Sequence, residues 1–140
     1  MSKKQNKRED EKEETTIKKF KAVFSKERVL ADKNDEAVDL YNKSRYGEYV
    51  EDKIQYSFVE ALHLLERKRL TLKDAKEKTI KIDAFRKLCE KTEKNFWVRY
   101  CVFRDLRQRG YIVKTALKFG ADFRVYDKGI KPGDDHAKWI

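Results

Sequence analysis

The chain has 140 residues, of which 43% are charged and 39% are apolar, and its formal net charge is +10. This length suits one domain or two small ones packed together, and eight Phe and seven Tyr provide for a modest core, which excludes a wholly disordered chain. No apolar run approaches the roughly 20 residues of a membrane span, and no apolar segment follows the N-terminal lysines as in a signal peptide, so we expect a cytoplasmic protein.

Residues 1–16 form a charged N-terminal tail. They carry five positive and five negative charges and no apolar residue after Met1. A segment of this composition cannot bury a core, so we expect a flexible, solvated tail. Because its charges cancel, it should add little to the binding of a polyanion. Ordered structure is expected to start near Ile17.

The next stretch predicts a strand pair and a helix. Residues 22–24 and 28–31 are typical of short strands joined by a turn. Residues 35–43 show apolar side chains at helical spacing, and Asn34 can cap this helix because its side chain can accept a hydrogen bond from the first turn. Residues 48–56 alternate loosely and predict one or two further strands.

A helix signal begins at Ser57. Ser57 and Glu60 have the spacing of a capping box, in which each side chain binds the backbone N–H of the other residue. We predict a helix over residues 58–68 and an edge strand over residues 70–73. His63 lies off the apolar stripe of this helix and has no evident partner in the sequence. We therefore interpret it as a structural or surface residue rather than a base or a metal ligand.

The second half of the chain predicts two helices and two strands. The helices span residues 82–91 and 94–109, and Gly110 is suited to end the second one. Strands are predicted over residues 111–117 and 121–127. A Gly/Pro-containing loop follows.

We expect an α+β fold in two parts, with a boundary near residues 80–90. The first part, residues 17–82, is predicted to be a small mixed α/β domain, and residues 83–140 are predicted to begin a second domain. Cys89 and Cys101 form no C-x-x-C motif. They are interpreted as small core residues of a reduced protein, rather than as a disulfide or zinc ligands.

The basic charge is densest in the C-terminal third. Residues 94–140 hold eleven positive and five negative charges, a net of +6. Such a surface suits a polyanion, because each phosphate contact releases counterions. Lysines and arginines on ordinary solvated faces explain the same charge, so both interpretations stay open at this point.

The strand over residues 121–127 and the loop after it contain residues that can perform acid–base chemistry. By strand alternation, Phe123 and Val125 should point into a core, while Arg124 and Tyr126 point the other way. The loop then supplies His136, an imidazole that titrates near neutrality. A strand tyrosine is more often packed and a loop histidine more often solvated, so these residues alone do not indicate catalysis.

A resemblance to a known family changes this interpretation. Two features of this chain resemble the start of the catalytic domain of archaeal tRNA-intron endonucleases. They are the stretch FRDLRQRGYIVKTALKFGADFRVY and the spacing from Tyr126 to His136. A helix of that family's N-terminal domain is similar to YSFVEALHLLERKRL, residues 56–70. The resemblance implies that residues 17–82 are the N-terminal endonuclease domain. Residues 83–140 are then the incomplete start of a catalytic domain with a mixed sheet flanked by helices.

The resemblance also implies a mechanism. Enzymes of this family remove introns from precursor tRNA at bulge-helix-bulge sites without a metal or other cofactor, leaving 2′,3′-cyclic phosphate and 5′-OH ends. Tyr126 aligns with the tyrosine proposed to take the 2′-OH proton, and His136 with the histidine proposed to protonate the leaving 5′-oxygen. An imidazole suits this task, whereas a phenol is a poor base unless positive charge lowers its pKa. Arg124 could provide that charge, although a solvated or phosphate-contacting role is favoured.

The family's third catalytic residue is a lysine further downstream. Lys138 has the wrong offset from His136 to take that role, so we expect the sequence to be a piece of a longer protein and to be nearly inactive alone. The expected partners are precursor tRNA and a second copy or partner endonuclease subunit. One alternative is a non-catalytic structural subunit, against which the presence of Tyr126 and His136 argues. Another is a general basic RNA-binding module, which would favour exposed aromatic side chains.

Overall fold

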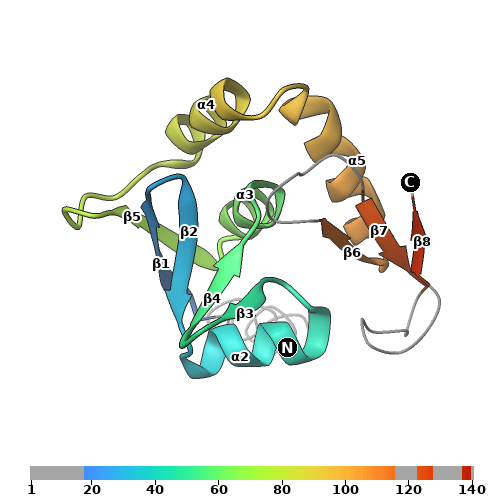
Figure 1. Cartoon of the computed structure of the whole chain (residues 1–140), viewed down its shortest axis with the longest axis horizontal. Coiled ribbons are helices and arrows are strands. Elements are labelled where there is room, and N and C mark those ends of the chain that lie inside the picture. Colours follow the sequence, from blue (N-terminus) through green and yellow to red (C-terminus); the bar gives the residue numbers. More distant parts are fainter. Residues whose placement is uncertain (1–17, 116–122, 128–136, 140) are drawn as a thin grey trace, which may run out of the picture.

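The computed structural model describes residues 18–115, 123–127 and 137–139 (Figure 1). These residues form helices and strands in an α+β arrangement, as expected. In chain order they are β1 (Phe20–Ser25), β2 (Arg28–Asp32), α2 (Asp35–Ser44), β3 (Glu48–Val50), β4 (Lys53–Tyr56), α3 (Phe58–Glu66), β5 (Leu70–Asp74), α4 (Ile82–Thr92), α5 (Phe96–Gln108), β6 (Ile112–Thr115), β7 (Phe123–Tyr126) and β8 (Ala137–Trp139).

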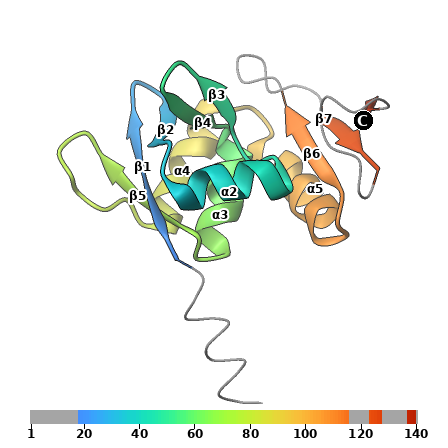
Figure 2. The same cartoon turned by 90° about the horizontal axis from the view of Figure 1, so that it is seen from below.

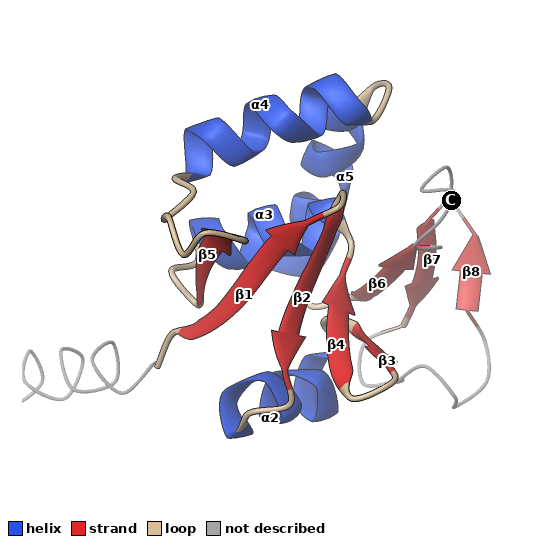
Figure 3. Ribbon diagram, turned by 60° about the vertical axis from the view of Figure 1, so that its left-hand side comes forward, coloured by secondary structure: helices blue, strands red, loops and turns tan. Residues whose placement is uncertain are grey.

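The N-terminal sheet has five strands in the order β3-β4-β2-β1-β5. β1 and β5 pair in parallel, and the other neighbours pair antiparallel, so the sheet is mixed. The predicted edge strand at residues 70–73 is confirmed by β5. The stretch over residues 48–56 forms two strands, separated by a turn in which Glu51 has a positive φ of 56°. Figure 3 shows α4 and α2 at opposite ends of this sheet.

The predicted helix caps of the N-terminal half are confirmed. The Asn34 side chain accepts a hydrogen bond from the backbone N–H of Ala37 at 2.8 Å, and α2 ends at Arg45 in the left-handed region. Ser57 and Glu60 form the capping box of α3, each side chain accepting a hydrogen bond from the other residue's backbone N–H. α3 ends two residues earlier than predicted, at Glu66.

The helices of the second half lie close to their predicted bounds, residues 82–91 and 94–109. In α5, Phe96, Tyr100 and Phe103 are buried. Gly110 follows the helix with a positive φ of 95° and donates its backbone N–H to the carbonyl of Arg107, which confirms it as the stop. Among the helices that the structure describes, none is both long and apolar enough to cross a bilayer.

The second sheet has the order β6-β7-β8, and its described strands are all antiparallel. β6 packs against α5, and α3 contacts β5, α4 and α5, so α3 lies centrally in the molecule (Figure 1). Figure 2 shows α2 running from the five-stranded sheet toward β6.

One cluster of buried apolar side chains extends through the molecule. It includes Val29 and Leu62 from the first part of the chain, and Phe103, Val113 and Phe123 from the second. Both sides of the predicted boundary therefore contribute to a common core. The domain boundary expected near residues 80–90 stays a prediction.

Candidate active site

Tyr126 ends β7, the central strand of the second sheet. Its Cα partners are Ile112 on β6 and Ala137 on β8. The predicted alternation holds for Phe123 and Val125, which are buried, and for Arg124, which is exposed. By this alternation Tyr126 lies on the face opposite Val125, yet it is only 5% exposed, so both faces of the strand are covered at its C-terminal end.

His136 lies outside the described residues, so the catalytic role expected for it beside Tyr126 stays a prediction. The residue that follows it in the chain, Ala137, is the Cα partner of Tyr126. Within the described ranges, no group of three or more His, Cys, Asp or Glu side chains is arranged to hold a metal ion.

Lys114 on β6 joins the second sheet to the N-terminal part of the molecule. The side chain is buried, and Nζ donates to the Glu60 carboxylate at 2.8 Å and to the carbonyls of Arg45 at 2.7 Å and Gly47 at 2.9 Å. Nζ also lies 3.3 Å from the Glu48 carboxylate. The strand that carries Lys114 pairs directly with β7, with Lys114 opposite Arg124. The contact therefore fixes the sheet that holds Tyr126.

Glu60 accepts hydrogen bonds at both carboxylate oxygens. Besides Lys114, it accepts the backbone N–H of Gly47 at 2.8 Å and that of Ser57 at 3.1 Å. Burial alone would raise the pKa of Glu60, but the Lys114 ammonium and the Gly47 amide outweigh it, so the pKa lies below its ordinary value. A capping residue of α3 is thus also the buried anion of the contact between the two parts.

Arg107 on α5 makes a second connection between the parts. Its guanidinium donates to the carbonyl of Ser44 at 2.6 Å, at the end of α2, and to the carbonyl of Val113 at 3.2 Å, on β6. It also lies 4.0 Å from the centre of the Tyr46 ring. Burial lowers the pKa of Arg107 from its ordinary value, although an arginine stays charged at neutral pH.

His63 is a structural residue. The other role expected for it, that of a surface residue, is wrong. The side chain is 2% exposed, and its Nδ1 lies 2.8 Å from the Tyr46 hydroxyl. Burial lowers the pKa of His63 to about 4, and the charges of Arg67, Arg107 and Arg104 add to this effect. The imidazole is therefore neutral at pH 7, and Nδ1 can accept a hydrogen bond from the Tyr46 hydroxyl.

Sequence reasoning missed Lys114 and Arg107 as residues that hold the two parts together. One signal for Lys114 was present, because it shares a strand face with the apolar Ile112, and a lysine is seldom buried beside apolar side chains without an acidic partner. The sequence does not show which carboxylate that is. Glu60 lies 54 positions away and already had an assigned role as a helix cap.

Two family models match the chain in succession. Residues 20–86 match the N-terminal domain of tRNA intron endonucleases, and residues 96–140 match the catalytic C-terminal domain. The change from one model to the other lies close to the boundary expected from the sequence.

Archaeal proteins named tRNA-splicing endonuclease are similar over most of the chain. That of Pyrococcus horikoshii is 38% identical, over 88% of this chain and 69% of its own length. That of Thermococcus onnurineus is also 38% identical, over 84% and 66%. That of Methanothermobacter thermautotrophicus is 44% identical, over 72% and 58%. The chain belongs to the tRNA-splicing endonuclease family, and it spans about two thirds of the length of these relatives.

Proposed function

We propose that this protein cleaves intron-containing precursor tRNA at bulge-helix-bulge sites. The observation that carries the proposal is the match to both endonuclease domains in the family's order, residues 20–86 and then 96–140. Tyr126 and His136 lie within the catalytic match. The residue after His136 pairs with Tyr126 across β7 and β8, which supports their action at one scissile bond.

The proposed reaction is a transesterification within the RNA. The ribose 2′-oxygen attacks the adjacent phosphorus while Tyr126 takes its proton, and the bond from phosphorus to the 5′-oxygen breaks. His136 gives a proton to that leaving oxygen. The products are a 2′,3′-cyclic phosphate and a 5′-OH. No water, metal ion or oxidant is consumed in this step.

Two requirements follow for the protein. The RNA has to reach the Tyr126 hydroxyl, although the side chain is only 5% exposed in the free chain. The family resemblance also calls for a lysine beyond residue 140 that stabilises charge in the transition state. Loss of one such donor commonly slows a reaction by about a hundred- to a thousandfold, so the 140-residue chain alone should cleave slowly. We expect the complete protein to act in the cytoplasm, as a homo-oligomer or with a partner subunit.

The reaction can be tested with a bulge-helix-bulge RNA and the protein carrying its natural C-terminal continuation. Single-turnover cleavage in EDTA should proceed at the rate seen with Mg²⁺, and the 5′ ends should accept phosphate from a kinase without prior dephosphorylation. Cleavage that requires a divalent ion, or that leaves a 5′-phosphate, would show that the roles assigned to Tyr126 and His136 are wrong.

Most of the aromatic side chains in the described part of the chain are buried, which does not favour a general RNA-binding module. Tyr49 is an exception at 43% exposed, and its ring contacts Tyr41 and Lys33. A non-catalytic structural subunit remains the competing function. In the same assay it would bind the RNA without cutting it.

A further inference from the structure

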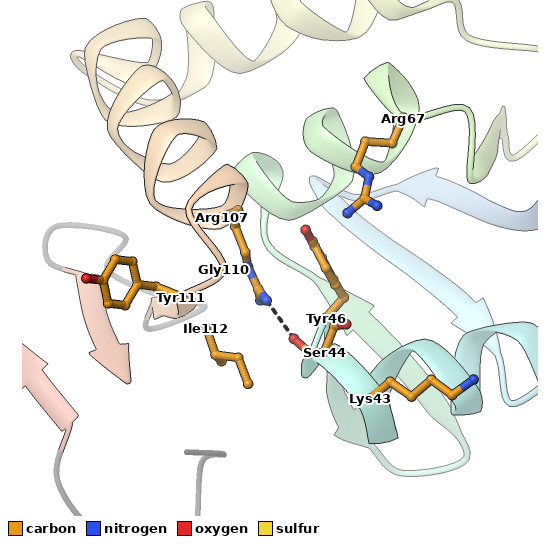
Figure 4. Close-up of a pocket in the computed structure, with 8 residues that line it drawn as sticks. All are labelled: Lys43, Ser44, Tyr46, Arg67, Arg107, Gly110, Tyr111 and Ile112. Atoms are coloured by element: carbon orange, nitrogen blue, oxygen red, sulfur yellow. Dashed lines mark hydrogen bonds between the residues drawn. The ribbon is translucent and has the colours of Figure 1, made fainter. Parts of the chain in front are cut away.

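A pocket of about 210 Å³ lies where the ends of α2, α3 and α5 approach the start of β6 (Figure 4). It is lined by Lys43, Ser44, Tyr46, Arg67, Arg107, Gly110, Tyr111 and Ile112. Neither Tyr126 nor Arg124 is among these residues, but Ile112, the Cα partner of Tyr126, is, so the pocket lies beside the end of β7 without including Tyr126. Nothing in the proposed reaction uses it.

The charge of the pocket is positive. Three of its eight lining residues are cations, Lys43, Arg67 and Arg107, and none is acidic. The pKa of the buried His63 reflects this positive charge. Burial lowers that pKa most, and the charges of Arg67 and Arg107 lower it further. An anion is the complementary ligand for such a pocket.

The three cations differ in the hydrogen bonds and ion pairs that they already make within the protein. Arg107 donates to the carbonyls of Ser44 and Val113, so it mainly connects the two parts of the molecule. Lys43 pairs with Asp39 at 3.1 Å, but both side chains are largely exposed and such a pair is weak. Arg67 makes a side-chain hydrogen bond with Tyr46, toward which Figure 4 shows its guanidinium directed, but the residue is exposed and its guanidinium has further donors. Arg67 and Lys43 are therefore the cations that an incoming anion can engage.

Helix stabilisation explains only part of this arrangement. Cations near the C-terminal end of a helix interact favourably with its carbonyls, and Lys43 and Arg67 both lie at such ends. That effect does not require the two helix ends to converge with α5 on one hollow that has no carboxylate in its lining. A guanidinium fork binds two phosphate oxygens at once, and a lysine on a flexible stem can turn in to add a third contact.

The volume of the pocket limits which anions fit into it. Pockets for drug-sized molecules commonly hold about 300–1,000 Å³, so this one is small for a whole nucleotide. A single phosphate group fits the chemistry and the scale better. The basic excess of the chain and its family membership favour a phosphate that is part of an RNA backbone.

We propose that this pocket binds one backbone phosphate of the RNA substrate other than the scissile one, with Arg67 as the main ligand and Lys43 as the second. The proposal rests on the proposed function, in that the RNA is taken to be the substrate. The proposed role of the pocket is to position the RNA, so Arg67 and Lys43 contribute to affinity and do not contact the reacting atoms.

The test compares two double variants that each remove two positive charges. Arg67→Gln with Lys43→Gln alters the pocket. Lys87→Gln with Lys91→Gln alters exposed lysines on α4, a helix that contributes no residue to the pocket. Affinity for the bulge-helix-bulge RNA is measured by fluorescence anisotropy at two or more salt concentrations. The single-turnover rate is measured at saturating protein, and circular dichroism checks folding.

We expect the pocket variant to bind about fivefold or more weakly, with the slope of log affinity against log salt reduced by about 1, as for the loss of one phosphate contact. Its rate at saturation should match that of the unmodified protein. The α4 variant should change affinity by less than about twofold. Equal losses in the two variants would mean that charge acts diffusely, and this would overturn the proposal.

A second measurement separates RNA from free phosphate as the source of the anion. Inorganic phosphate is titrated while the Arg67 side-chain N–H signal is followed by NMR. If the Arg67 signal responds to phosphate but the pocket variant keeps full RNA affinity, the pocket serves a free anion, and the RNA assignment is wrong. A protein that binds RNA through the pocket but cuts nothing would refute the proposed function alone. A protein that cuts normally but loses no affinity in the pocket variant would refute only the pocket.

Discussion

Replacing Lys114 by Met should expose how much the contact between the two parts stabilises the fold. Methionine keeps a similar length but removes the ammonium, so Glu60 stays 1% exposed with no cation in contact. Breaking a buried ion pair from one side commonly costs about 3–5 kcal/mol. Glu60 can escape this cost by taking up a proton. At pH 7 that requires about 4 kcal/mol, because each unit above its ordinary pKa of about 4.3 costs about 1.4 kcal/mol.

The pH dependence makes this prediction specific. In the unmodified protein the pKa of Glu60 is lowered, so the stability from the ion pair is present above the ordinary pKa and is lost as the pH falls through the folded value. In Lys114→Met the same pKa should be raised, so the carboxyl is easily neutralised in acid. The stability difference should therefore be about 3–5 kcal/mol at pH 7 and about 2 kcal/mol smaller at pH 5.

Urea unfolding followed by far-UV circular dichroism at both pH values measures the difference. Lys87→Met, at an exposed position on α4, is the matched control and should change the free energy of unfolding by less than about 0.5 kcal/mol. Adding Glu60→Gln to Lys114→Met should recover part of the loss, because it removes the unpaired charge. A loss below about 1 kcal/mol, or one that is the same at pH 5 and pH 7, would refute the view that the pair is buried and mutually dependent.

Three further substitutions test other parts of the fold. The pKa of His63 is about 4 in the folded protein and near 6.5 in the unfolded chain, which therefore binds the proton first, so the free energy of unfolding should fall as the pH drops from about 6.5 to about 4. His63→Gln should remove this pH dependence in urea unfolding, and a dependence that persists would contradict the burial argument. Gly47→Ala should destabilise by about 2 kcal/mol or more, since φ is +88° and a Cβ would lie 2.5 Å from Ile54 Cγ2; a thermal midpoint equal to that of the unmodified protein would count against this. Asn34→Ala should cost about 1 kcal/mol through loss of the cap of α2, and amide exchange should show the first turn fraying; unchanged exchange there would mean that the cap is not needed.

Much of the fold could be predicted from the sequence because its signals are local. Asn34 and the pair of Ser57 and Glu60 define where helices begin, and Gly110 defines where one ends. In α5, Phe96, Tyr100 and Phe103 have the spacing of one helix face, and all three are buried. Errors at element ends, such as the two residues of α3, reflect turns whose geometry the local sequence does not determine.

The parts that could not be predicted depend on pairing between distant residues. Lys114 and Glu60 meet only because the fold brings the Lys114 side chain of β6 to the first turn of α3, and neither residue identifies the other in the sequence. Tyr126 is buried although alternation sets it opposite the buried Val125, and strand alternation alone cannot reveal that both faces are covered. The assignment of Tyr126 and His136 to catalysis came from family resemblance, since a tyrosine and a histidine ten residues apart have no local pattern of their own.

The most direct test of the proposed function separates binding from cleavage in Tyr126→Phe and His136→Ala, each made in the protein with its natural C-terminal continuation. The bulge-helix-bulge RNA is mixed with saturating protein, and the single-turnover rate and the dissociation constant are measured in EDTA. Both variants should cleave about a hundredfold or more slowly while their affinity changes by less than about threefold, because proton transfer matters only while bonds form and break. Rates equal to that of the unmodified protein, or a loss confined to affinity, would contradict the account.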